Sequence, residues 1–346
     1  MNCSTRNCST RNARRDRLPR AGIDLLLLLG LLLAPLGGGA FSQETTFRAQ
    51  SNVVVIPALV KGAKGEIVYG LTAKDFVVED DGVEQSVHLD EAAEGQPASV
   101  VVAIQVGRRA GYEFPRIRGL SAMLDPLVEE GRGSVAIIEF DSQVHPVQDF
   151  TGDSDQIARS LRELQPGDGG AAILDAVDYS VKLLEQVPKE RQRVLLLISE
   201  TRDHGSHDAK VEDVVAEIGQ SSTAVYALAF SPSRSNVLDT MRGNNAAEMH
   251  PSPDLLAPLV MAAEAMKKNM PKTVASMTGG EYELFATRKN FDARMIDFTN
   301  HVHNRYLLSI EPKNPHPGLH QLRVRLRDAR DVVVLARSSY WAAGTK

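Results

Sequence analysis

Four short, continuous apolar segments, separated by stretches with helical periodicity, constrain the fold of this chain more than any other feature. The apolar segments are Ser99–Ile104, Ser134–Phe140, Val194–Ile198 and Val225–Phe230. Runs of this length are typical of strands buried on both faces, as in a parallel sheet covered by helices. Apolar residues recur at three- and four-residue spacing in six further segments: Ile117–Glu129, Ser154–Leu164, Ile173–Gln186, Ala209–Ile218, Leu255–Met277 and Phe291–His303. This order predicts an α/β domain with a doubly wound, mostly parallel sheet.

Shorter β segments flank this predicted domain on both sides. Strand-like runs and turn signals fill Asn52–Leu89 before it and recur in Arg305–Ile310, Gln321–Arg327 and Val332–Ala336 after it. We therefore divide the chain into a leader (1–42), an N-terminal β domain (43–95), the α/β domain (96–304) and a C-terminal β segment (305–346). One arrangement that the pattern allows is that the two β parts pack together in a small sandwich.

The first 42 residues have the order of a secretory signal peptide. Six arginines between Arg6 and Arg20 precede the apolar run Leu25–Leu33, and the small residues Ala40 and Ser42 indicate cleavage after Ser42. The apolar run is shorter than the roughly 20 residues that a membrane span needs. We therefore expect export to the periplasm, the outer surface or the medium. An uncleaved signal anchor is the alternative, and only in that case do we expect membrane attachment.

Composition and charge exclude several classes of function. Hydrophobic residues make up 43% of the chain and charged residues 24%, which is typical of a folded protein. Both cysteines, Cys3 and Cys8, lie in the leader, so a cleaved chain has no thiol for catalysis or for metal binding. The leader holds six arginines and two aspartates, so its removal changes the formal net charge from −5 to −9. This charge argues against a nucleic acid or an anionic membrane as the main partner.

Four stretches of the α/β domain resemble the von Willebrand factor A family, and more closely its bacterial, Acidobacteria-type related proteins. They are Val100–Gly107, Val135–Ser142, Gly169–Ala176 and Val194–Glu200. The segments Gly70–Gly82 and Tyr306–Tyr340 resemble the parts that flank the A domain in those bacterial proteins. The resemblance covers nearly the whole chain after the leader and rests on order and pattern rather than on one motif. It implies adhesion or assembly rather than catalysis.

In that family a cation of the magnesium type is held by an Asp-x-Ser-x-Ser loop, a Thr in a second loop and an Asp in a third. The corresponding positions in this chain are Ile104, Val106 and Arg108, then Ala171, then Glu200. Mg²⁺ prefers carboxylate and hydroxyl oxygens, and an arginine repels it. The resemblance therefore implies a degenerate site, and we expect no metal and no other cofactor. A weak Mg²⁺ ion held by Asp203 and water is the alternative that stays open.

Without a metal, a ligand has to be recognised by direct contacts at the carboxyl ends of the strands. The predicted ligand-binding face consists of Gln105, Gly107, Arg108, Arg109, Glu200, Asp203 and His204. A sharper hypothesis is that the guanidinium of Arg108 takes the place of the cation and pairs with Glu200. The alternative is that both side chains point into water. We expect a protein or cell-envelope ligand.

Two histidine motifs are the basis of an enzyme alternative. His204-Gly205-Ser206-His207, with Asp203, is a candidate loop for a metal-dependent or hydrolytic enzyme, and His301-Val302-His303 closes the last predicted helix. The sequence has no Gly-x-Ser-x-Gly elbow, no phosphate loop and no dinucleotide fingerprint. We therefore predict an exported, non-enzymatic protein-binding module, and keep that enzyme and a structural envelope scaffold as alternatives.

Overall fold

The computed structural model describes residues 53–90, 96–107, 110–131, 133–230, 257–313, 316–327 and 331–343. These residues all belong to one compact unit. The predicted signal peptide lies outside the described residues, and so do Arg108 and Arg109. The hypothesis of an Arg108–Glu200 pair therefore stays a prediction.

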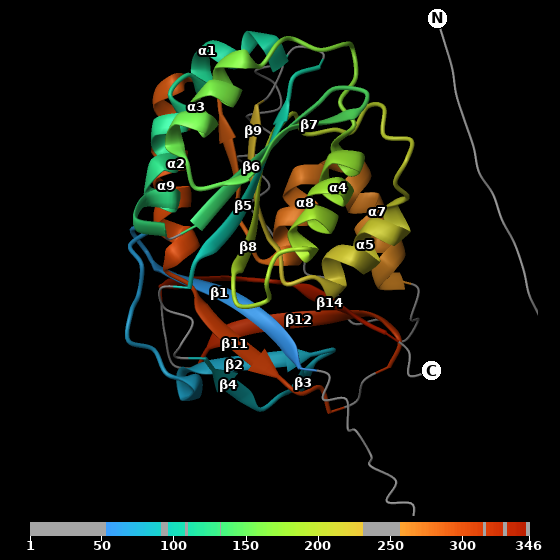
Figure 1. Cartoon of the computed structure of the whole chain (residues 1–346). Coiled ribbons are helices and arrows are strands. Elements are labelled where there is room, and N and C mark those ends of the chain that lie inside the picture. The colour runs from blue at the N-terminus through green and yellow to red at the C-terminus, as the bar shows by residue number, and fades with distance from the viewer. Residues whose placement is uncertain are drawn as a thin grey trace, which may run out of the picture. The chain divides into compact units, whose positions relative to one another are not determined.

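A six-stranded sheet forms the centre of the unit (Figure 1). Its strands are β5 (Ala98–Gln105), β6 (Gly133–Phe140), β7 (Val144–Thr151), β8 (Gln192–Ser199), β9 (Ala224–Phe230) and β10 (Tyr282–Phe285), in the spatial order β10-β9-β8-β5-β6-β7. Neighbouring strands are parallel except for β6 and β7, which are antiparallel. Every residue of β5 is buried, as its continuous apolar sequence predicts. The predicted doubly wound, mostly parallel sheet is confirmed.

Helices cover both faces of this sheet (Figure 1). The helices α1 (Phe114–Ile117), α2 (Leu120–Val128), α3 (Ser154–Glu163) and α9 (Arg288–His303) pack on one face, and α4 (Ile173–Glu185), α5 (Val211–Gln220), α7 (Ala257–Lys268) and α8 (Met270–Thr278) pack on the other. Gly119, with a φ of 104°, separates α1 from α2, so the helix predicted from Ile117 begins at Leu120. The helix predicted over Leu255–Met277 is divided at Asn269, whose side chain caps α8 by accepting from the Lys272 amide.

The remaining strands form two antiparallel, four-stranded sheets, in the orders β13-β1-β11-β4 and β14-β12-β2-β3. The strands are β1 (Val54–Gly62), β2 (Phe76–Asp80), β3 (Val83–Glu84), β4 (Val87–Leu89), β11 (Tyr306–Ile310), β12 (Gly318–Leu326), β13 (Val332–Ala336) and β14 (Ser339–Ala342). Short 3₁₀ turns lie at Ala73–Asp75, Ala110–Tyr112 and Glu129–Gly131. Each sheet contains strands from both ends of the chain, and Ile56, Phe76 and Leu308 share one core between them. The segments before and after the α/β part therefore fold together.

Arg337 joins the two small sheets to the α/β part. Its side chain donates to five main-chain carbonyls, those of Ile218, Gly219, Ser221, Val55 and Ser339. Three of these carbonyls lie at the end of α5, where a helix carries partial negative charge. Burial lowers the pKa of Arg337 to about 10, so the guanidinium is charged at neutral pH. In the described part of the chain, no helix has the length and apolar character that a membrane crossing requires.

Candidate functional site

The order of the central strands reverses at β5, which lies between β6 and β8. Sheets of this type bind ligands at the carboxyl ends of the strands beside such a reversal. The loop after β5, the turn Asp141–Gln143, the loop 164–172 and the loop 200–210 meet at this place, and we call them the loop face. Gly107 allows the close approach, because a Cβ there would overlap the carbonyl oxygen of Gly170 and the Cβ of Asp141.

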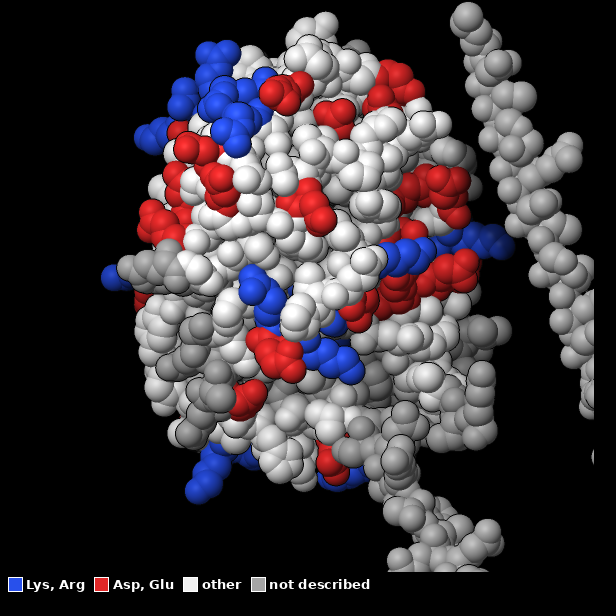
Figure 2. Space-filling model, in the orientation of Figure 1, with Lys and Arg blue, Asp and Glu red and all other residues white. Residues whose placement is uncertain are grey.

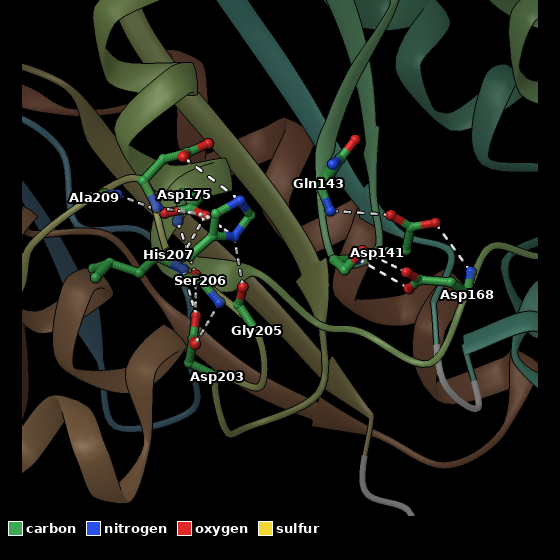
Figure 3. Close-up of polar contacts among 12 residues, drawn as sticks. Asp141, Gln143, Asp168, Asp175, Asp203, Gly205, Ser206, His207 and Ala209 are labelled. Atoms are coloured by element: carbon green, nitrogen blue, oxygen red, sulfur yellow. Dashed lines mark hydrogen bonds and ion pairs between the residues drawn. The ribbon is translucent and has the colours of Figure 1, made fainter.

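Asp141 and Asp168 tie the β6–β7 turn to the loop before α4 (Figure 3). Asp141 Oδ2 accepts from the Asp168 amide at 3.0 Å, and Oδ1 accepts from the Gln143 amide at 3.1 Å. In return, Asp168 Oδ1 accepts from the amides of Ser142 (3.0 Å) and Gly170 (2.7 Å), and its Oδ2 accepts from the Ser142 hydroxyl. These hydrogen bonds lower the pKa of Asp168, with the Ser142 hydroxyl as the largest cause. Both carboxylates are therefore ionised and committed to the loops.

The first turn of α4 is capped by residues of another loop. Ala172, at its N-cap position, has no side chain that accepts a hydrogen bond. Asp203 Oδ2 accepts instead from the Leu174 amide at 2.8 Å, and the Ser206 hydroxyl oxygen accepts from the Asp175 amide at 3.1 Å. Asp203 also accepts from the Ser206 hydroxyl (2.5 Å) and amide (3.2 Å). Since the N-terminus of a helix carries unsatisfied donors and positive charge, an aspartate is well suited to this place.

Asp175 makes the reciprocal contacts from α4 to the loop after β8 (Figure 3). Its side chain is 5% exposed and accepts from the amides of His207 (3.0 Å), Asp208 (3.4 Å) and Ala209 (2.8 Å). The same two loops also pair through their main chains, because Ala171 and His204 exchange two hydrogen bonds of 2.7 and 2.9 Å. The loop face is therefore held by carboxylates and main-chain amides.

The sequence resemblance assigns cation-ligand positions to Ile104, Val106, Ala171 and Glu200, and this assignment stays a prediction. Ile104, Val106 and Ala171 are at most 2% exposed and supply no side-chain oxygen. Glu200 is 4% exposed, and its carboxylate lies 3.9 Å from His204 Nε2. This donor set does not fit Mg²⁺, which needs several oxygen ligands.

The residues predicted to bind a ligand differ in how far they are exposed to solvent. Gln105 is 1% exposed, and its Oε1 accepts from the Glu200 amide at 2.8 Å, so it supports the loop after β8 and cannot touch a ligand directly. Gly107 and Glu200 are buried too, and Asp203 is half-buried and capping, whereas His204 is exposed. Asp168 and His207 are exposed on the same face. The sequence predicts direct contacts from the His204–His207 loop, and it brings Asp168 near the site only in an alternative register.

The histidines of the enzyme alternative are not arranged as a base beside a nucleophile. The Ser206 hydroxyl donates to Asp203, and His207 Nδ1 lies 3.0 Å from the Gly205 carbonyl. At the end of α9, buried His301 contacts Glu281 at 3.0 Å, and Lys61 pairs with the same carboxylate at 3.1 Å. His301 therefore belongs to a structural ion-pair network.

We expect His207 to titrate above its ordinary pKa of 6.5, because the Gly205 carbonyl, Asp208 and Asp175 raise its pKa. Protonated His207 then stabilises the folded state fully below about pH 6.5, and this stabilisation is lost as the pH rises through the raised pKa of His207. An NMR titration of the ring proton measures this, and Asp208→Asn should lower the pKa whereas Asp149→Asn, on β7, should not. A wild-type value at or below 6.5 would contradict the geometry.

Residues 113–205 match the family model of the von Willebrand factor type A domain. No curated protein matches the sequence significantly. Among solved structures, BatB from Bacteroides thetaiotaomicron is similar at 15% identity, over 59% of this chain and 98% of that chain, with a TM-score of 0.39. The vWF domain of the type V pili tip protein Mfa5 from Porphyromonas gingivalis is similar at 10% identity, over 60% and 95%, with a TM-score of 0.41.

Proposed function

We propose that this chain, whose α/β unit is a von Willebrand factor type A domain, is an exported, non-enzymatic protein-binding module that binds its ligand without a metal ion. One observation carries the proposal. The loops of the loop face are already joined to one another by four aspartates. These accept hydrogen bonds from main-chain amides of neighbouring segments, and they are Asp141, Asp168, Asp175 and Asp203. A face that is ordered in this way needs no cation to bring the loops together.

The proposed ligand is a protein or another component of the cell envelope, bound by direct contacts. The exposed side chains of Asp168, His204 and His207 contribute to the contact surface, and we keep Arg108 and Arg109 in it as a proposal. Acidic side chains are spread over the side of the molecule seen in Figure 2, and basic ones gather over α1. This mixed charge suits a protein partner better than a nucleic acid, which selects a continuous basic surface.

A capture experiment with the purified chain tests the proposal. The immobilised chain is exposed to an envelope extract, in 5 mM Mg²⁺ or in EDTA, and bound proteins are identified by mass spectrometry. We expect one dominant partner whose retention does not change in EDTA and falls at least tenfold with Arg108→Glu or His204→Glu, as for lost interfacial polar contacts. Arg323→Glu, at an exposed position of β12, is the matched control.

Retention that requires Mg²⁺ would contradict metal-independent binding. Retention that is unchanged in both loop-face variants but lost in Arg323→Glu would place the binding surface elsewhere. Turnover of a substrate that disappears with Asp203→Asn would support the enzyme alternative instead.

A further inference from the structure

A second cluster of titratable side chains lies away from the loop face, in the sheet β14-β12-β2-β3. Asp80 ends β2, Asp81 begins the turn to β3, His316 precedes β12 and His320 lies within β12. Figure 1 shows β2 and β12 at the end of the molecule opposite the loops that follow β5 and β8. The proposed function does not use this cluster.

The distances in the cluster are those of atoms that can share one ion. Asp81 Oδ2 lies 2.8 Å from His320 Nδ1 and 3.2 Å from His316 Nε2. One ligand atom from each of these three residues lies within 4.8 Å of the other two. Asp80 Oδ1 adds a further carboxylate oxygen at 3.2 Å from His320 Nδ1. Ligand atoms around a tetrahedral zinc ion are about 3.3 Å apart, given bonds of about 2.0 to 2.1 Å.

The surrounding contacts orient the same atoms. His320 Nε2 donates to the His316 carbonyl at 2.7 Å, which turns Nδ1 toward the two carboxylates. The Tyr340 hydroxyl donates to Asp80 Oδ2 at 3.1 Å, and Asp81 Oδ1 accepts from the Gln321 amide at 2.9 Å. Histidine and carboxylate ligands of metals are held by such outer hydrogen bonds.

His320 Nδ1 faces both carboxylates, at 2.8 Å from Asp81 Oδ2 and 3.2 Å from Asp80 Oδ1. A divalent ion bound at Nδ1 meets these two negative charges. His320 is fully buried, whereas the side chains of His316 and Asp81 are 40% and 36% exposed, so the cluster can be reached from solvent.

We propose that Asp81, His316 and His320 bind a transition-metal ion of the zinc class, with Asp80 as the fourth ligand. Two imidazoles and two carboxylates suit Zn²⁺ and not Mg²⁺ or Ca²⁺, which take oxygen ligands. In the metal-free chain the two imidazole rings are stacked with their centroids 3.9 Å apart. An ion must lie near the plane of each ring, so the exposed His316 ring turns out of the stack when the ion binds. The ion then joins the β2–β3 turn to β12, across 235 residues of sequence.

Isothermal titration of the full chain with Zn²⁺, after dialysis against EDTA, tests this site. We expect one ion per chain and no heat from Mg²⁺. Asp81→Asn and His316→Asn should each weaken Zn²⁺ binding at least tenfold. Asn tolerates the positive φ of 48° at position 81, so the turn is preserved. Asp203→Asn and His207→Asn, at the loop face, are the matched controls and should bind Zn²⁺ as the wild type does.

Thermal unfolding supplies a second readout. Zn²⁺ at a hundredfold excess over its Kd should raise the Tm of the wild type by about 5 °C, and the same Zn²⁺ concentration should raise the Tm of Asp81→Asn by no more than about half as much. No Zn²⁺ binding at 100 µM, or equal binding by the wild type and Asp81→Asn, would overturn the proposal. Zinc binding that is lost with Asp203→Asn instead would overturn it as well, and would also contradict the metal-free loop face. Failure of the capture experiment alone leaves this site untouched.

Discussion

Replacement of Arg337 with alanine is expected to lower the free energy of unfolding by about 4 kcal/mol. Arg337 is 4% exposed, and its guanidinium donates to five carbonyls, three of them in the residues that end α5. Alanine would remove the donor of these five carbonyls and leave an empty space where the guanidinium now lies. Since the five carbonyls belong both to the α/β part and to the small sheets, the variant should loosen the contact between them.

Urea unfolding measures this effect. Trp341 is the single tryptophan of the chain and lies against Gly219 at the end of α5, so its fluorescence reports on the same contact. Arg323→Ala, at an exposed position in β12, is the matched control and should change the free energy of unfolding by less than about 0.5 kcal/mol. If Arg337→Ala loses less than about 1 kcal/mol of unfolding free energy, water replaces the guanidinium, and the contact between the α/β part and the small sheets does not depend on Arg337.

Asp203→Ala is expected to cost about 3 kcal/mol of unfolding free energy. The substitution removes the acceptor of the Leu174 amide in the first turn of α4, and it removes both contacts to Ser206. Because Ala172 provides no cap of its own, nothing on the helix replaces Asp203. The measurement is chemical unfolding at pH 7.

Two further variants separate this role from a general effect of charge. Asp208→Ala removes a carboxylate of the same loop whose side chain is 80% exposed, and it should change the free energy of unfolding by less than about 0.5 kcal/mol. In a double-mutant cycle, Asp203→Ala and Ser206→Ala should couple by at least about 1 kcal/mol, because they share a hydrogen bond. Additive effects would mean that the two side chains act separately.

Much of the fold follows from local pattern. The buried strands β5, β6, β8 and β9 have continuous apolar sequences because both of their faces are covered by helices. The edge strands β7 and β10 were not predicted, since they are only partly buried and lack such a run. β1 pairs with β11, which lies about 250 residues later in the chain. The local sequence of neither segment indicates which strand it pairs with.

The site was less predictable than the fold. The resemblance alone assigns Ile104, Val106 and Ala171 to positions where the family has oxygen ligands, and this assignment stays a prediction. The contacts by which Asp203 and Asp175 join the loop after β8 to α4 could not be predicted, because these side chains reach main-chain amides about 30 residues away. Gln105 was assigned to the contact surface because it lies at the end of a strand. It is buried because β5 has a neighbour on each side.

Amide hydrogen exchange at the loop face, in 10 mM Mg²⁺ and in EDTA, tests the central claim most directly. If carboxylates and main-chain hydrogen bonds alone hold these loops, the amides of Leu174, His207 and Ala209 exchange at the same slow rates in both conditions. Exchange of these amides that is at least tenfold faster in EDTA would show that a cation organises the loop face, and would contradict the account.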